Sequence, residues 1–491
     1  MEWASDNPPN NPQYNLLNNP RISLMEDART RIVCTIGPAS ASVTMLHRMM
    51  SAGMDVARLN FSHGTYPEHA ALMKAIRLAS RKAGKTIAIL QDLQGPKIRV
   101  GDLGNGVMLH AGETVTFSAA KNAKVADGVI PLTYERLGKD VKPGHRILLD
   151  DGYLEVEVLQ AKGMTVTAVV KITGLLKSHK GANFPDSTLQ VSSFTAKDRE
   201  DLLFGVQHEV DWICLSFVTG PEVLEGVRSL IKKTAKEFGV RAPLVMAKVE
   251  RKAALERLDE IIEASDAIML GRGDLGVEIP PEEVPIVQKD VVERCRFAGK
   301  AVIVATQMLE SMRENPRATR AEFSDVANAV FDHADAVMLS AESAAGKYPA
   351  VTVQAMASVI REAEKSRFDD VPEDDSLVNC LPSALAHTLA VMSRRQIIRG
   401  IVIASSFGPA VGSLLMFRPR VPVIVVVPDE ASARQALLHI GVTPMVMDDH
   451  GGTFVPRMHA VLHSRLRLPA GECVAYITNT GGGVSLSLIA L

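Results

Sequence analysis

Lysine and carboxylate side chains end two neighbouring apolar runs of this sequence, where they could act together. The run Leu244–Glu250 ends in Lys-Val-Glu, so Lys248 and Glu250 point the same way from an extended strand. The strand formed by the next run is expected to end at Asp274. Carboxylates without Cys or His partners suit a hard, oxygen-liganded cation such as Mg²⁺ or Mn²⁺. A structural salt bridge explains one Lys–Glu pair equally well, and the nearby Asp274 favours the metal site.

Further polar residues follow other apolar runs. The stretch Arg58–His63 offers a guanidinium and small amide and hydroxyl groups on alternate residues, which suits a phosphate together with a cation. Arg272–Leu275 reads as the first turn of a helix, whose free N–H groups could hold a carboxylate. Thr306 and Ser340 end two more runs. A helix cap or a solvated corner explains any one of these, and their convergence on one rim is what indicates a site.

Positioning these residues requires strands whose ends meet. From Thr30 onward, short β-branched or apolar runs alternate with helix-like stretches. The runs are Arg31–Ile36, Asp55–Asn60, Thr86–Asp92, Asp211–Phe217, Leu244–Glu250, Ala267–Leu270, Ala301–Thr306 and Ala336–Ser340. Eight strand-helix units predict an α/β fold, a (β/α)8 TIM barrel, with its active site where the C-terminal ends of the strands meet.

The repeat is interrupted once, because about 118 residues separate Asp92 from Asp211. Residues 97–187 are rich in Val, Thr and Gly and show alternating patterns, which predicts an inserted small β-barrel or sandwich that acts as a lid. We therefore expect a disordered tail at 1–28, the barrel at 29–96 and 188–368, the lid at 97–187 and a C-terminal open α/β domain at 369–491.

Composition narrows the classes of function. The 491 residues carry a formal net charge of −2, which argues against nucleic-acid binding. No apolar stretch is long enough to cross a membrane, and no secretory or transit signal opens the chain. The five cysteines lie far apart and form no Cys-x-x-Cys pair. These features predict a cytoplasmic protein without membrane or nucleic-acid partners.

Several long motifs resemble those of pyruvate kinases, and the resemblance covers essentially the whole chain from Thr30. The matching stretches are Val33–Ser40, Ala57–Gly64, Gly271–Gly276 around Asp274, Ala305–Met312, Asn315–Glu322 and Asp325–Val330. The departures are mild: Arg251 where the family often has Asn, Ala341 and Ser343 within the usual Ser-Gly-Glu-Thr, and Phe184–Asp186 in a loop that commonly reads Asn-Leu-Pro-Gly.

The resemblance implies that this chain transfers the phosphoryl group of phosphoenolpyruvate to ADP in glycolysis, giving pyruvate and ATP with Mg²⁺, or Mn²⁺, as cofactor. The residues that it implies are Lys248, Thr306 and Arg58 for catalysis; these three with Gly273 and Asp274 for phosphoenolpyruvate; Glu250 and Asp274 for the metal; and Asn60, Ser62, His63, Arg99, Asp151 and Lys180 for the nucleotide. Thr306 would relay a proton from water to the enolate, and lid closure would exclude water from the phosphoryl group.

The stretch after the third run bears on monovalent cations. Many pyruvate kinases need K⁺ and read Asp-Thr-Lys-Gly-Pro-Glu-Ile-Arg-Thr there, whereas this chain reads Asp-Leu-Gln-Gly-Pro-Lys-Ile-Arg-Val. The monovalent-cation region would comprise Asn60, Ser62, Asp92, Leu93 and Lys97. The ammonium of Lys97 could replace the field of K⁺, so the resemblance is to the K⁺-independent branch. Alternatively, Lys97 pairs with a surface carboxylate at the lid hinge.

The resemblance also implies a homotetramer and a phosphorylated effector at the turn Ser405–Gly408, although an ordinary strand-to-helix corner explains this turn equally well. Two other functions fit parts of the sequence. A metal-dependent pyruvate-enolate aldolase would have no nucleotide for a lid to cover. A catalytically silent sugar-phosphate sensor would not need the intact set of Lys248, Glu250, Asp274 and Thr306.

Overall fold

The computed structural model describes residues 28–120, 122–125, 128–187, 189–371, 377–404, 408–447, 454–466, 471–479 and 484–490. The tail expected at 1–28, apart from Ala28, and the effector turn Ser405–Gly408, apart from Gly408, therefore lie outside the described residues. Over the described ranges, none of the helices combines the length and the apolar character that a membrane crossing requires.

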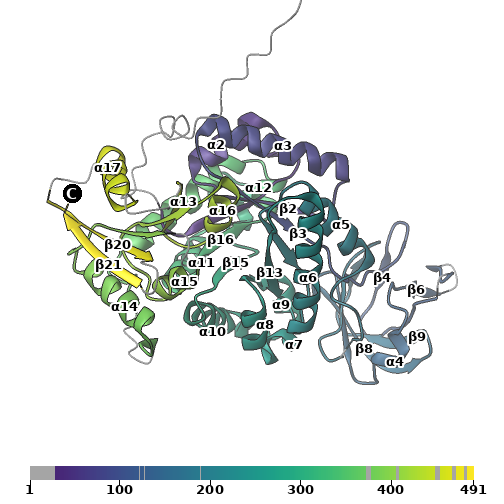
Figure 1. The fold of residues 1–491 in the computed structure, drawn as a ribbon. Helices are drawn as coiled ribbons and strands as arrows, with labels where there is room; N and C mark the ends of the chain where they lie inside the picture. The colour runs from purple at the N-terminus through teal and green to yellow at the C-terminus, as the bar shows by residue number, and fades with distance from the viewer. Residues whose placement is uncertain are drawn as a thin grey trace, which may run out of the picture.

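The centre of the molecule is a closed barrel of parallel strands in the order β1-β16-β15-β14-β13-β12-β3-β2 (Figure 1). The strands are β1 (Arg31–Thr35), β2 (Val56–Asn60), β3 (Ala88–Asp92), β12 (Trp212–Leu215), β13 (Leu244–Val249), β14 (Ala267–Gly271), β15 (Ala301–Ala305) and β16 (Ala336–Leu339). Each of the eight expected runs contributes one strand, so the (β/α)8 prediction is confirmed.

Helices surround the barrel and begin and end at recognisable signals. They are α2 (Val43–Ala52), α3 (Tyr66–Ala83), α5 (Ala196–Gln207), α6 (Pro221–Phe238), α7 (Lys252–Glu256), α8 (Leu258–Ala264), α9 (Arg272–Glu278), α10 (Val284–Phe297), α11 (Arg320–Phe331), α12 (Ala341–Ala344) and α13 (Pro349–Lys365), with 3₁₀ helices at Pro281–Glu283 and Glu310–Arg313. Thr65 and Glu68 form a capping box at the start of α3, and Gly84 ends it with φ of 60°.

One expected strand end is wrong. Strand β14 ends at Gly271, and Asp274 lies instead in the first turn of helix α9. A Cβ atom at Gly271 would lie 2.7 Å from Cγ of Glu250, so glycine allows the two chain segments to approach here. The chain turns into α9 directly after this glycine, which confirms the helical turn predicted at Arg272–Leu275 and places Asp274 on a helix rather than on a strand.

The insertion is a β domain beside the barrel, at the lower right of Figure 1. Its strands are β4 (Val107–Leu109), β5 (Thr114–Ser118), β6 (Val129–Pro131), β7 (Arg146–Leu149), β8 (Leu154–Lys162), β9 (Thr165–Val170), β10 (Gly174–Leu176) and β11 (Ala182–Asn183), with helix α4 (Leu137–Asp140). Six strands pair in the order β11-β7-β8-β9-β5-β6. Bridges from Arg99 to Gly181 and from Val100 to Leu132 join the two edges, so the segment entering the domain closes the sheet into a small barrel.

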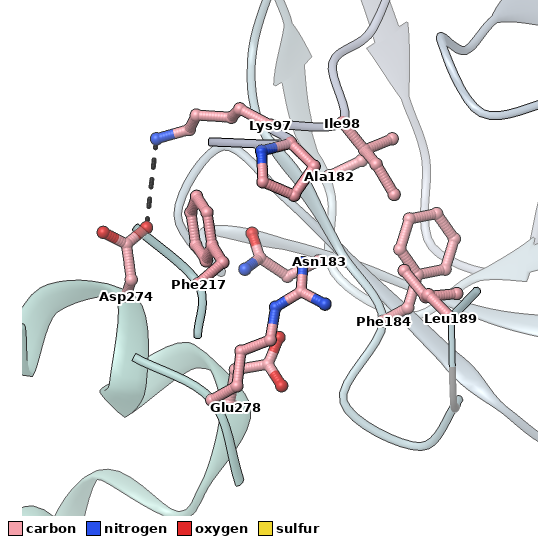
Figure 2. A pocket seen from close by; sticks show the side chains of 11 residues that line it. Lys97, Ile98, Ala182, Asn183, Phe184, Leu189, Phe217, Asp274 and Glu278 are labelled. Carbon is pink, nitrogen blue, oxygen red and sulfur yellow. Dashed lines mark ion pairs between the residues drawn. The ribbon is translucent and has the colours of Figure 1, made fainter. Parts of the chain in front are cut away.

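A narrow pocket lies between the insertion and the barrel, and Figure 2 shows the side chains that line it. Lys97 and Asn183 reach it from the insertion side, and Asp274 and Glu278 reach it from helix α9. The side chain of Asn183 hydrogen-bonds to Glu278, and burial raises the pKa of that carboxyl group. The lid therefore contacts the barrel at the helix that carries Asp274.

The C-terminal part is an open α/β sheet on the opposite side of the barrel from the insertion (Figure 1). Its strand order is β19-β18-β17-β20-β21, and only the β20–β21 pair is antiparallel. The elements are α14 (Leu381–Arg394), β17 (Gly400–Ala404), α15 (Gly408–Leu415), β18 (Val423–Val427), α16 (Glu430–Ala436), β19 (Val442–Val446), α17 (Phe454–Leu466), β20 (Cys473–Asn479) and β21 (Val484–Ala490).

This C-terminal sheet domain closes the barrel at the N-terminal ends of its strands. Leu438, which follows α16, is fully buried and belongs to the apolar cluster inside the barrel, together with Trp212 and Met269. Arg418 forms a buried ion pair with Asp335, which precedes β16, at 2.8 Å. The side chain of Leu438, from the C-terminal sheet domain, therefore fills the end of the barrel at which its strands begin.

Candidate active site

The polar residues at the barrel mouth continue the inward-facing rows of the strands. In β13, Met246 lies in the interior cluster while Val245 and Ala247 face the helices. Because side chains alternate along a strand, Lys248 and Glu250 share the inward side of Met246. By the same alternation, the inward-facing side chains are Ala88, Leu90 and Asp92 in β3 and Val56, Arg58 and Asn60 in β2. In β12 and the residue after it they are Trp212, Cys214 and Ser216.

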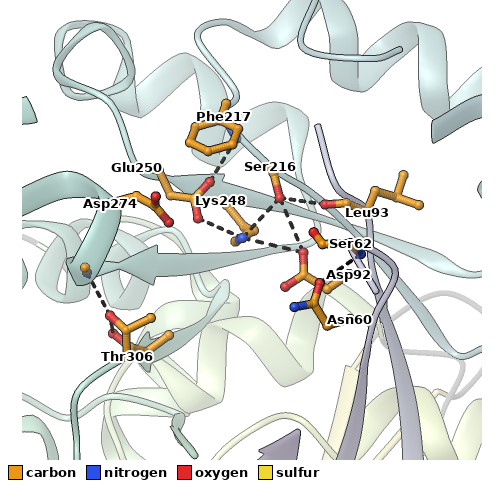
Figure 3. A network of polar contacts seen from close by, with 12 residues as sticks. Asn60, Ser62, Asp92, Leu93, Ser216, Phe217, Lys248, Glu250, Asp274 and Thr306 are labelled. Carbon is orange, nitrogen blue, oxygen red and sulfur yellow. Dashed lines mark hydrogen bonds and ion pairs between the residues drawn. The ribbon is translucent and has the colours of Figure 1, made fainter. Parts of the chain in front are cut away.

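The ammonium group of Lys248 lies at the centre of a buried polar network (Figure 3). Its Nζ atom is 2.7 Å from Oε1 of Glu250, 3.0 Å from Oγ of Ser216 and 3.5 Å from Oδ1 of Asp92. Burial disfavours the ammonium form, but the carboxylates of Asp92 and Glu250 outweigh this, so the pKa of Lys248 is raised. A permanently charged ammonium group is therefore fixed at the mouth of the barrel.

The two carboxylates proposed as metal ligands come from adjacent strand-helix units. Glu250 accepts a hydrogen bond from the backbone N–H of Phe217 at 3.0 Å and lies near Asp274 (Figure 3). Burial raises the pKa of Glu250, the Asp274 carboxylate raises it further, and Lys248 only partly offsets these effects. Two carboxylates that disfavour each other's charge fit the environment of a divalent cation, since the cation would remove that repulsion.

Arg58 is held rigidly beside this network. Its Nε and Nη2 atoms lie 2.7 and 2.6 Å from Oδ2 of Asp92, and its Nη1 donates to the Thr35 hydroxyl at 2.8 Å. Burial raises the pKa of Asp92, but Lys248 and Arg58 together bring it below its ordinary value. Asp92 therefore orients both cations, an arrangement that suits recognition of a phosphate at this point.

Thr306 and Gly273 meet across two neighbouring loops. The Thr306 hydroxyl donates to the carbonyl of Ala305 at 2.6 Å and accepts from the N–H of Gly273 at 2.8 Å. The N–H expected to hold a substrate carboxylate thus contacts the hydroxyl expected to relay a proton. Thr306 has φ of 71° and Gln307 has φ of 56°, a left-handed conformation that is uncommon for residues other than glycine.

The predicted nucleotide residues form two separate groups. Asn60 ends β2, and Ser62 and His63 lie in the turn that follows, where Asn60 Oδ1 accepts from the N–H of Ser62 at 3.1 Å. On the lid, Lys180 pairs with Asp150 at 2.6 Å, and Arg99 donates to the carbonyl of His179. Asp151 is exposed and has φ of 55°. Among the described residues, no hydrogen bond or ion pair joins the turn after β2 to these lid residues.

Lys97 lies beside the proposed metal ligand rather than within the Asn60, Ser62 and Asp92 group. Its Nζ atom is 3.9 Å from Oδ1 of Asp274 (Figure 2). Leu93 is buried, and its carbonyl accepts from the Ser216 hydroxyl at 2.7 Å. The charge introduced by Lys97 therefore acts at the metal side of the mouth.

Two functional contacts were missed in the sequence. Ser216 links Lys248, Asp92 and Leu93, and the alternation from Trp212 and Cys214 would have identified it as inward-facing. Arg272 donates to the carbonyl of Thr306, and no local pattern indicates this contact because Thr306 follows β15, 34 residues further along the chain.

Comparisons with known proteins cover both the barrel and the C-terminal sheet domain. Residues 27–353 match the family model described as pyruvate kinase, barrel domain, and residues 383–486 match pyruvate kinase, alpha/beta domain. The chain is 43% identical over 429 residues to pyruvate kinase of Staphylococcus haemolyticus, which covers 85% of this chain and 72% of that protein. It is 41% identical over 428 residues to the Staphylococcus aureus protein of the same name, with the same coverage.

A solved structure gives the same result. The crystal structure of a pyruvate kinase from Cryptosporidium parvum superimposes with a TM-score of 0.88 at 29% sequence identity, covering 97% of this chain and 99% of that one. The similarity therefore extends over the barrel, the insertion and the C-terminal sheet domain.

Proposed function

Since this chain belongs to the pyruvate kinase family, and thus transfers a phosphoryl group from phosphoenolpyruvate to ADP, we propose the following roles for its residues. The observation that carries them is the buried Lys248 ammonium, which Glu250, Asp92 and Ser216 hold at the barrel mouth. A fixed cation there stabilises the charge on the transferring phosphoryl group and on the enolate that remains. Arg58, oriented by Asp92, binds the phosphate.

Glu250 and Asp274 would hold Mg²⁺, or Mn²⁺, which when bound neutralises charge on the substrate oxygens that it contacts. The N–H groups of Gly273 and Asp274 hold the substrate carboxylate, with the Gly273 N–H shared between this carboxylate and the Thr306 hydroxyl. Thr306 passes a proton from water to the enolate carbon. Asn60, Ser62 and His63 hold the nucleotide together with Arg99, Asp151 and Lys180 of the lid, which closes over it and excludes water.

Metal binding tests the ligand assignment. Glu250→Gln should weaken Mn²⁺ binding, measured directly by titration, by at least about tenfold because the pair of carboxylates is lost. Glu278→Gln is the matched control, since Glu278 lines a pocket together with Asp274 and its side chain bonds to Asn183. Equal half-saturation for Glu250→Gln and the parent would exclude Glu250 as a ligand.

We also propose that activity does not require K⁺. The support is the positive charge of Lys97 at the mouth, where an ammonium would repel a second cation. In a tetramethylammonium buffer with Mg²⁺, added K⁺ should stimulate turnover by less than about tenfold. Lys97→Glu should create K⁺ stimulation, while Lys233→Glu, the same charge change on the exposed surface of α6, should not. Strong stimulation of the parent by K⁺ would refute the proposal.

Assembly and regulation are proposed on the same premise: a homotetramer that acts in the cytoplasm and responds to a phosphorylated effector. One supporting feature is that β21 forms an edge of the C-terminal sheet and exposes 49% of Leu488. Sedimentation should give four chains, and monomers would oppose the proposal. Sugar phosphates and AMP should raise turnover at subsaturating phosphoenolpyruvate, and failure of the whole panel would exclude the effector.

A further inference from the structure

The backbone at Thr306 requires support from its surroundings. Thr306 and Gln307 are consecutive residues with φ of 71° and 56°. A β-branched side chain in this left-handed region is strained, because its Cβ atom crowds the backbone. Without a tertiary contact, the segment would relax toward an ordinary extended conformation and carry the Thr306 hydroxyl away from the N–H of Gly273.

Arg272 supplies that contact. From the first position of α9, its Nη2 atom donates to the backbone carbonyl of Thr306 at 2.8 Å. The same guanidinium forms a bidentate pair with Asp325 of α11, both contacts being 2.7 Å, and Nη1 also bonds to Gln288 of α10 at 3.1 Å. Only 11% of the Arg272 side chain is exposed. Two helices therefore fix the guanidinium that contacts the strained residue.

We propose that Arg272, oriented by Asp325, is a positioning residue for Thr306. By holding the Thr306 carbonyl, it keeps the left-handed backbone that directs the hydroxyl toward Gly273 and the barrel mouth. This inference rests on the role proposed above for Thr306. In that step, the hydroxyl proton passes to the methylene carbon of the enolate, a C–H bond forms, and a proton from water replaces the one lost. Arg272 itself touches neither the substrate nor the reacting atoms and acts through Thr306.

A purely structural role would have a different consequence. If Arg272 only tied α9 to α11, its loss would lower stability and affect every catalytic step alike. A positioning role instead affects proton transfer more than substrate binding, because a small displacement of a reacting group lowers the rate steeply. The proton step can be observed alone through the exchange of the methyl protons of pyruvate with D₂O in the presence of Mg²⁺ and ATP.

The experiment measures this exchange by proton NMR in the full-length enzyme. Arg272→Met should slow it by about tenfold to hundredfold, while the dissociation constant of phosphoenolpyruvate changes by less than about threefold. Arg272→Lys, which retains one donor for the Thr306 carbonyl, should recover part of the exchange. Asp325→Asn should slow it in the same direction and serves as a second test if Arg272→Met does not fold. Arg294→Met, at an exposed arginine paired with Asp290 and Asp259, is the control.

A double variant separates failure of this inference from failure of the role proposed for Thr306. If Thr306→Val exchanges protons as fast as the parent, the proposed proton path is wrong whatever Arg272 does. If Thr306→Val is slow, Arg272→Met should slow it little further, because both changes remove the same group. Independent, multiplicative effects of the two substitutions, or normal exchange in Arg272→Met, would overturn the positioning role.

Discussion

The two domains attached to the barrel are held by different kinds of contact. On the lid side, Lys97 and Asp274 are 3.9 Å apart and their side chains are 30% and 29% exposed. On the opposite side, Arg418 and Asp335 are 2.8 Å apart and only 4% and 1% exposed. Arg434 of α16 adds a second contact of 2.7 Å to Asp211, which is also buried. A long pair that is partly open to solvent contributes little to stability, whereas loss of one partner of a buried pair strongly destabilises the protein.

Apolar contacts also attach the C-terminal sheet domain to the barrel more closely than they attach the lid. Leu438 of the C-terminal sheet domain belongs to the cluster that fills the barrel, whereas the lid has a separate core of its own. One domain is therefore part of the folded barrel, and the other rests against it. The proposed catalytic groups lie on the side with the weaker attachment, which suits the closing movement proposed for the lid, because regions that move must have low local stability.

The largest expected effect is on turnover and comes from a substitution at the barrel mouth, on the side that faces the lid. Lys248→Met should lower kcat by about a thousandfold or more while leaving the affinity for phosphoenolpyruvate within about tenfold, since the cation acts mainly on the transition state. Steady-state kinetics and direct binding measure the two quantities. Lys252→Met, which removes an exposed lysine at the start of α7, should leave kcat nearly unchanged. A raised KM with unchanged kcat in Lys248→Met would contradict the role.

The next largest effect is on the free energy of unfolding and comes from a substitution where the C-terminal sheet domain meets the barrel. Asp335→Ala leaves the Arg418 guanidinium buried without its carboxylate and should lower the free energy of unfolding by about 3–5 kcal/mol. Lys97→Ala removes the half-buried pair on the lid side, whose Nζ–Oδ1 distance is 3.9 Å, and should change this free energy by less than about 1 kcal/mol. Urea unfolding followed by circular dichroism gives both values. Similar losses in the two variants would remove the distinction between the two attachments.

Leu438→Ala tests whether the C-terminal sheet domain is part of the barrel core. Loss of this fully buried side chain should cost about 2–5 kcal/mol and shift the unfolding of the barrel itself. Trp212 lies in the same cluster, so its fluorescence, measured in a Trp3→Phe background, reports on the barrel. Leu381→Ala, at a leucine of α14 that is 69% exposed, is the control and should have little effect. An unchanged fluorescence transition in Leu438→Ala would mean that the C-terminal sheet domain contacts the barrel without contributing to the stability of the barrel core.

The smallest expected effect is a pH dependence of the free energy of unfolding, caused by His439 at the contact between the C-terminal sheet domain and the barrel. Burial lowers the pKa of His439, with Asp335 acting against this and Arg418 acting with it. The unfolded chain, with a histidine pKa of about 6.5, then binds more protons than the folded chain just below that pH. Stability should therefore fall as the pH is lowered from about 6.5 toward the folded pKa.

Urea unfolding at several pH values measures this dependence. His439→Gln should reduce the slope of stability against pH in this range. His110→Gln, at an exposed position of the lid, should leave the slope unchanged. If His439→Gln retained the full slope, another group would be responsible for it.

The sequence by itself determined the barrel and much of its mouth. Hydrophobic alternation has a period of two in strands, so the inward row from Met246 to Lys248 and Glu250 follows from local pattern alone, and it would have revealed Ser216 as well. Eight such runs allow few architectures, because parallel strands need helical crossovers that pack outside the barrel.

Only the tertiary structure decided which distant residues meet. The pairing of Lys97 with Asp274, the insertion of Leu438 into the barrel and the contact of Arg272 with Thr306 each join elements that are far apart along the chain. The helical turn at Arg272–Leu275, by contrast, was predicted from local sequence, and only the expected strand end at Asp274 was wrong, since β14 ends at Gly271. The three long-range contacts depend on the relative placement of whole elements, which is set by packing over the entire domain and leaves no signal in the residues nearby.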